Sequence, residues 1–214
     1  MDDAVVQSLI KWPAVPTCCG WLALDRRGVW RMRDDYAQTH RLPGDPIKHA
    51  ALNAFISRNY ACDTEGRYFF QNGPQRVFVD LEATPWVVRM MPTTDANYPW
   101  VMKTQCDSIL NPSGALLDEA GHIYIEGTLI QTVYQSKDTD LRSGTEPNFV
   151  TTERPSIALL HDHDLELFSS LTTLHESTCS IAGVWHWDGN TLALEPIRMT
   201  ELAQRFQFQT HPRP

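Results

Sequence analysis

The stretch Asp63-Thr-Glu-Gly66-Arg-Tyr68 decides the fold, because its pattern of an Asp-x-x-Gly turn between apolar runs recurs along the chain. Aspartate at the start of a turn accepts hydrogen bonds from main-chain N–H groups further on, and glycine supplies the positive φ that lets the strand return. Each copy therefore predicts a β-hairpin. The other copies are Asp25–Gly28, Asp118–Gly121 and the shorter Asp188-Gly189.

Helical spacing is confined to a few segments. One well-defined helix is predicted over 46–58, with Asp45 as N-cap, Pro46 in the first turn and an apolar face that lies on the N-terminal sheet. A short amphipathic helix is predicted for the first eleven residues, and another begins at Thr200. For 164–174 the spacing favours a helix narrowly over the return strand of a hairpin.

Together these signals predict an α+β fold of mainly antiparallel sheets with repeated hairpins. We expect two compact halves, residues 1–95 and 96–214, the second rich in strands. Residues 136–155 are polar and turn-rich, and predict a long loop inside the second half. Because long loops on a rigid scaffold often carry function, we expect this loop to border the site.

Composition excludes several classes of protein. The 214 residues carry a net charge of -8, which argues against general binding to nucleic acid or to an anionic membrane. The densest basic group, Arg26, Arg27, Arg31 and Arg33, is expected on a solvated hairpin. There is no signal-peptide pattern and no apolar run long enough to span a membrane, so we expect a cytoplasmic location.

Five cysteines form no disulfide framework, because their number is odd and two are adjacent. Cys18 and Cys19 lack the two-residue spacer of a thioredoxin-like redox pair, and we expect partly buried thiols. Cys62 and Cys106 lie in predicted strands and are expected in the core.

Residues from about 21 to 132 resemble an uncharacterised bacterial family, the domain of unknown function numbered 1285. The matching segments are Gly28-Val-Trp30, Asp63–Tyr68, Lys103–Asp107 and Ile123–Leu129. The resemblance implies a two-part α+β fold of sheet-and-helix units and a signalling or regulatory role. This chain has Glu126 where the family usually has a basic residue, and residues 136–214 are expected to be an extension of its own.

The histidine-rich region 161–179 is the strongest candidate for a metal or catalytic site. His161, His163, His175 and Cys179 offer zinc-ligand side chains, but their spacing matches no established zinc pattern. We therefore expect no metal and no cofactor, and we assign no catalytic residue.

Seven tryptophans are present, and those on predicted strands are expected in the core. Trp185 and Trp187 share one strand face, which would form an apolar binding platform if it were open. Nucleophile-elbow, P-loop and dinucleotide-binding motifs are missing from the sequence. We expect a non-enzymatic regulatory or ligand-binding module whose partner is a small molecule or a protein. The alternative is an enzyme or metalloprotein that uses region 161–179.

Overall fold

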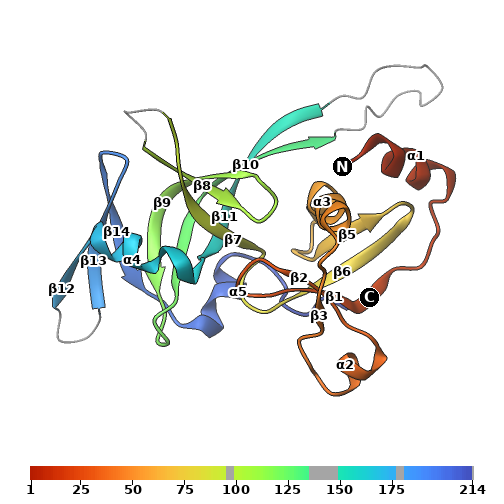
Figure 1. Ribbon diagram of the computed structural model, residues 1–214, viewed down its shortest axis with the longest axis horizontal. Coiled ribbons are helices and arrows are strands. Elements are labelled where there is room, and N and C mark those ends of the chain that lie inside the picture. The colour runs from red at the N-terminus through yellow and green to blue at the C-terminus, as the bar shows by residue number, and fades with distance from the viewer. Residues whose placement is uncertain (95–98, 135–148, 177–180, 214) are drawn as a thin grey trace.

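The computed structural model describes residues 1–94, 99–134, 149–176 and 181–213, which form two β-sheets lying side by side (Figure 1). The first sheet has the strand order β3-β2-β1-β6-β5-β4, in which only β1 and β6 run parallel. Its strands are β1 (Cys18–Leu24), β2 (Trp30–Met32), β3 (Asp45–Pro46), β4 (Tyr60–Cys62), β5 (Tyr68–Asn72) and β6 (Gln75–Leu81).

The second sheet closes on itself as a barrel. Its strands are β7 (Trp86–Pro92), β8 (Trp100–Thr104), β9 (Ile109–Leu117), β10 (Ile123–Tyr134), β11 (Phe149–Leu160), β12 (Thr172–Glu176), β13 (Ile181–Trp187) and β14 (Asn190–Pro196). Strand β10 pairs with both β9 and β11, which completes the circle β10-β11-β7-β8-β9. The end of β9 pairs with β14 instead of β8, so β12, β13 and β14 extend from the barrel as a wing.

The α+β class is confirmed, but both sheets are mixed. The hairpins are antiparallel as expected, whereas β1–β6, β7–β11 and β9–β14 are parallel pairings. Each parallel pair joins strands that are far apart in the sequence. A hairpin turn predicts pairing only between two consecutive strands, so the turns in the sequence could not predict these parallel pairings.

The three Asp-x-x-Gly turns share one hydrogen-bond pattern. In each, one carboxylate oxygen of the aspartate accepts the N–H groups two and four residues on, at 2.9 and 2.8 Å for Asp118. Asp25 and Asp63 do the same. Gly66 has φ +74° in the turn that Asp63 begins, which confirms the predicted conformation.

The helices are α1 (Asp3–Lys11), α2 (Asp35–Thr39), α3 (Ala50–Arg58), α4 (Leu165–Ser170) and α5 (Leu202–Arg205). The expected helix 46–58 starts only at Ala50, because Asp45 and Pro46 pair with β2 as strand β3. His49 takes the N-cap position and accepts a hydrogen bond from the Leu52 N–H at 3.2 Å. The helix lies on the first sheet as expected, where its Phe55 ring is 5.4 Å from that of Phe70.

Two other boundaries differ from expectation. The helix expected over 164–174 ends at Ser170, and Leu174 belongs to β12, which pairs with β13. Of the loop expected over 136–155, residues 149–155 are part of β11 and pair with β10. Residues 135–148 lie outside the described residues.

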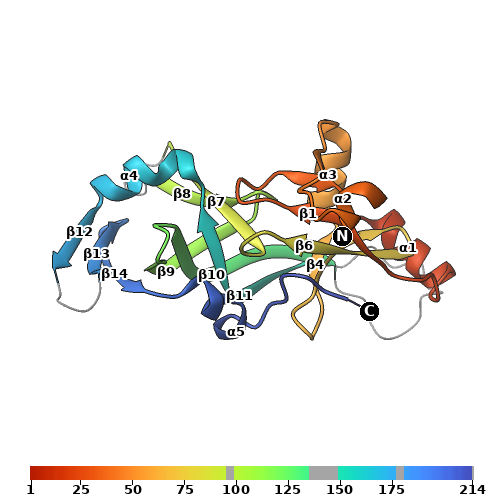
Figure 2. The same cartoon turned by 90° about the horizontal axis from the view of Figure 1, so that it is seen from below.

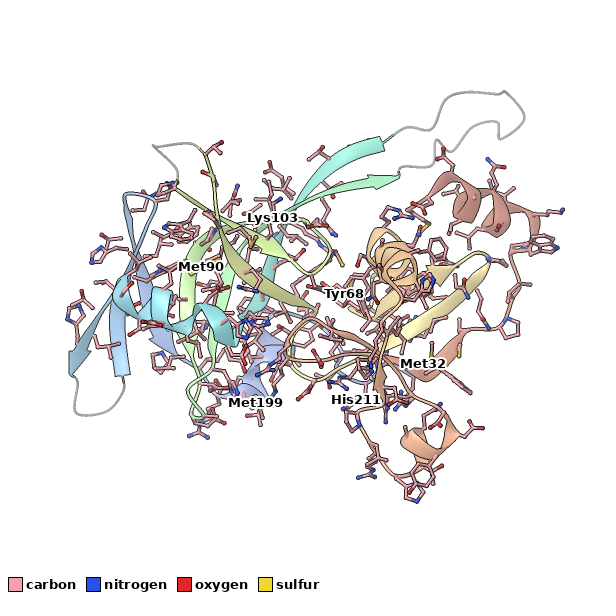
Figure 3. The ribbon with its side chains drawn as sticks, viewed as in Figure 1. Met32, Tyr68, Met90, Lys103, Met199 and His211 are labelled. Atoms are coloured by element: carbon pink, nitrogen blue, oxygen red, sulfur yellow. The ribbon has the colours of Figure 1, made fainter. Side chains whose placement is uncertain are left out.

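Aromatic side chains join the two sheets into one core. Trp86 of β7 is fully buried, with its ring 5.1 Å from Tyr60 and 5.9 Å from Tyr68 of the first sheet. Figure 3 shows Tyr68 between the barrel and the first sheet. Within the described part of the chain, every helix is too short to cross a membrane.

Candidate functional site

Of the candidate zinc ligands in region 161–179, the structure brings only His161 and His163 close together among the described residues. His161, Asp162 and His163 follow β11 on a 3-10 turn, and their potential ligand atoms lie within 4.8 Å of one another. However, Asp162 already pairs with Arg27 at 2.5 Å, and His161 Nδ1 accepts the His163 main-chain N–H at 3.1 Å. Burial lowers the pKa of His161, which favours the neutral ring.

The more distant members of that region do not complete a site. His175 is exposed on β12, eleven positions after the last residue of the 3-10 turn (Asp162–Asp164). Cys179 lies outside the described residues. Cys18 and Cys19 are free thiols at the start of β1, and burial raises the pKa of both. A raised pKa leaves less thiolate, the form that reacts.

The tryptophan platform is closed. Trp185 is fully buried and Trp187 is 7% exposed, because Phe168 of α4 packs on the Trp185 ring at 5.1 Å. The expectation that strand tryptophans are buried is wrong for Trp21, which is 40% exposed. It lies on the opposite side of β1 from its buried neighbours, as alternation along a strand requires.

The four arginines of the basic group are paired with carboxylates and not simply solvated. Their partners are Glu82 for Arg26, Asp162 for Arg27, Asp25 for Arg31 and Asp80 for Arg33. Two of these arginines, Arg31 and Arg33, face a cavity of about 630 Å³ beside the first sheet. Strands β1, β2 and β6, the segment around α2 and the end of the chain all contribute to its wall.

We call this space the arginine cavity. Its charged lining residues are Asp25, Arg31, Arg33, Arg41, Asp80, Glu82, His211 and Arg213. Its other lining residues include Gln38 and the apolar Leu24, Leu42, Pro43 and Leu81. Apolar walls with a few charged groups are typical of small-molecule sites.

A buried carboxylate organises the cavity. Asp80 is only 4% exposed, and the guanidinium of Arg33 donates to one of its oxygens. Its other oxygen lies 3.2 Å from Arg213 Nη1 and 3.6 Å from His211 Nδ1. A buried carboxylate needs such partners, because an unpaired charge in a poorly solvated place is costly. Asp25 is held similarly, by Arg31 Nε at 2.7 Å.

Arg41 differs from the other arginines of the cavity. No hydrogen bond or ion pair joins its guanidinium to any residue that the structure describes. Its main chain has φ +54°, an uncommon conformation for a residue other than glycine. Four arginines thus face three carboxylates in this cavity, within a chain whose net charge is -8. The local surplus of positive charge attracts anions.

Sequence reasoning missed most of this cavity. Asp80 is a single carboxylate between the apolar Val79 and Leu81 of β6, and His211 and Arg213, from a distant part of the sequence, cover it. Arg41 and Arg213 lie in segments without a motif. The sequence signal was the density of arginines in β2 and in the residues on either side of it.

Comparisons with known proteins place the chain in a family. Comparison with curated proteins finds no match. A solved structure described as a DUF1285 family protein from Silicibacter pomeroyi DSS-3 is similar, with a TM-score of 0.42 and 16% identity over 96% of this chain and 100% of that one. It comes from the family that the sequence segments resemble. The family described as "Protein of unknown function (DUF2946)" matches residues 1–213, and the chain belongs to that family.

Proposed function

We propose that this protein is a non-enzymatic binding module that holds a small anionic molecule in the arginine cavity, and that binding there has a regulatory role linked to signalling. The observation that carries the proposal is Arg41, a guanidinium that lines the cavity without a partner among the described residues. Guanidinium groups match the geometry of carboxylate and phosphate groups, to which they donate two parallel hydrogen bonds.

The size and charge of the cavity support this ligand class. Its volume of about 630 Å³ falls within the usual range for small-molecule sites. The buried carboxylates Asp25 and Asp80 are already engaged by arginines, so they hold the cationic wall in place. This arrangement favours binding over acid–base catalysis, which needs a carboxylate that is free to exchange a proton.

Calorimetric titration of the protein with inorganic phosphate and with succinate tests the proposal. We expect at least one of them to bind and to raise the melting temperature, whereas glycerol, a neutral control, has no effect. Arg41→Ala should weaken binding by about tenfold or more, because a charge-assisted hydrogen bond contributes about 1.5–3 kcal/mol. Arg198, an exposed arginine outside the cavity, provides the matched control Arg198→Ala. Equal affinities for the two variants would contradict the proposal.

Metal binding at the 3-10 turn is the second candidate, and it rests on the 4.8 Å grouping of His161, Asp162 and His163. Arg27 opposes it, because its guanidinium already neutralises Asp162. A metal would have to displace that arginine. Titration of the protein and of its Arg27→Ala variant with Zn²⁺ tests this candidate. Binding by the variant alone would indicate a site that Arg27 blocks, and binding by neither would indicate that there is no zinc site at this turn.

A further inference from the structure

The end of the chain crosses the first sheet as a strap. We define the C-terminal strap as residues 206–213, which follow α5. Figure 2 shows this last blue segment running from α5 beside the barrel to the first sheet, where the C-terminus lies. Figure 3 labels His211 on this segment, and Asp80 of β6 is its neighbour. The strap thereby connects the two sheets on one side of the molecule.

Two kinds of contact anchor the strap. Phe208 is 6% exposed and belongs to the common hydrophobic core. Gln209 donates its main-chain N–H to Gly66 O at 2.9 Å and its side-chain amide to Glu65 O at 3.0 Å. The Leu81 N–H donates to Thr210 O at 2.7 Å, so the strap also bonds to the end of β6. The anchors lie on the Asp63–Gly66 turn and on β6, outside the charged wall of the cavity.

Beyond these anchors the strap supplies part of the arginine cavity. His211 and Arg213 line the cavity, and both face the buried carboxylate of Asp80. With the strap docked, four arginines face three carboxylates. Without it, Arg213 is lost and three arginines face three carboxylates, while Asp80 keeps Arg33 as its arginine partner among the residues that the structure describes. Docking of the strap therefore strengthens the attraction for anions that the unpartnered Arg41 already gives the cavity.

We propose that docking of the C-terminal strap and anion binding in the arginine cavity are coupled, so that each stabilises the other. This inference rests on the proposed function, because it concerns the same cavity. The coupling is reciprocal by thermodynamic linkage. Displacement of the strap weakens binding of the anion, and binding of the anion stabilises the docked strap. The position of the strap then reports whether the cavity is occupied, which is how a binding module can pass on a signal.

A substitution outside the cavity tests the coupling. A Cβ at Gly66 would lie 2.1 Å from Gln207 O, so Gly66→Ala must displace the strap from the turn. Gly121→Ala is the matched control: Gly121 ends the same type of turn at φ +85°, and a Cβ there meets no atom within 4 Å. Both variants introduce the same strain at positive φ, but only the first displaces the strap.

Hydrogen exchange and calorimetry on the full chain provide the two readouts. In Gly66→Ala we expect faster exchange of the Leu81 amide and about tenfold weaker binding of inorganic phosphate or succinate, as for the loss of one charge-assisted contact. Gly121→Ala should retain both properties. Arg213→Ala removes the ion pair with Asp80 but keeps Phe208 in the core and the main-chain hydrogen bonds of Gln209 and Thr210, so it should weaken binding similarly while the Leu81 amide stays protected. In the unmodified protein, saturating anion should slow exchange at Leu81.

The outcomes separate the two proposals. If the unmodified protein binds the anion and Gly66→Ala exposes the Leu81 amide at unchanged affinity, the coupling is wrong and the proposed function stands. If Gly66→Ala leaves that amide protected, the strap does not depend on the turn and the coupling is likewise wrong. If neither phosphate nor succinate binds the unmodified protein, the proposed function fails and the coupling fails with it. Loss of affinity in Gly66→Ala and Arg213→Ala, but not in Gly121→Ala, supports both.

Discussion

The contrast between Gly66 and Gly121 predicts how two chemically identical substitutions differ in their effect on stability. Both glycines end an Asp-x-x-Gly turn at positive φ, +74° and +85°. Alanine at either position lowers the free energy of unfolding by about 1 kcal/mol, because its Cβ is disfavoured in the left-handed region. A Cβ at Gly121 meets nothing further, so Gly121→Ala should cost only that amount.

At Gly66 the strap adds to the cost. The new Cβ collides with Gln207 O, and moving the strap breaks the hydrogen bonds from Gln209 to Gly66 and Glu65 and from Leu81 to Thr210. Each such bond contributes about 1 kcal/mol, and partial exposure of Phe208 removes about 1 kcal/mol more. We expect Gly66→Ala to lower the free energy of unfolding by about 3 to 5 kcal/mol in total.

Urea unfolding followed by tryptophan fluorescence measures both values. The dependence of the free energy on urea should also be smaller for Gly66→Ala, because a native state with a displaced strap already exposes surface. Gly121→Ala should keep the slope of the unmodified protein. Equal destabilisation by the two substitutions, within about 0.5 kcal/mol, would refute the reasoning, because it would show that the strap does not press on the turn.

Other substitutions test the core, the turns and the histidine region. Trp185→Ala should destabilise by about 3–5 kcal/mol in urea unfolding because the ring is fully buried, whereas Trp21→Ala on the exposed face should cost less than about 1 kcal/mol. Burial of Asp118 is outweighed by hydrogen bonds, first from the His122 N–H, that hold its pKa below the usual value, so its stabilisation is present above about pH 4 and lost on acidification. Asp118→Asn should therefore lower stability at pH 7 and flatten the acid limb of a stability–pH curve, and an unchanged limb would contradict this. Elemental analysis of the purified protein should find no stoichiometric zinc, and one zinc per chain that disappears in His163→Ala would contradict that expectation.

The hairpin turns could be predicted because their chemistry is local. Asp63 accepts hydrogen bonds from the N–H groups two and four residues on, and Gly66 supplies the positive φ, so the five residues 63–67 contain the whole interaction. The same holds for the helix on the first sheet, because the spacing of its apolar residues correctly predicted a helix there. Its start was misplaced because pairing of Pro46 with Arg31 of β2 overrides a favourable N-terminal sequence, and that strand is distant in the chain.

The amino-acid sequence by itself determined the hairpins, most of the helical segments and the α+β class, because turn chemistry and apolar spacing act within a few residues. Only the tertiary structure decided the parallel pairings, the closure of the barrel through β10 and the packing of Phe168 on the Trp185 ring. It also decided the arginine cavity, since Asp80 is buried by Arg213, 133 positions further along the chain. Such contacts depend on how whole strands and the chain end are brought together in space, and no local pattern encodes that arrangement.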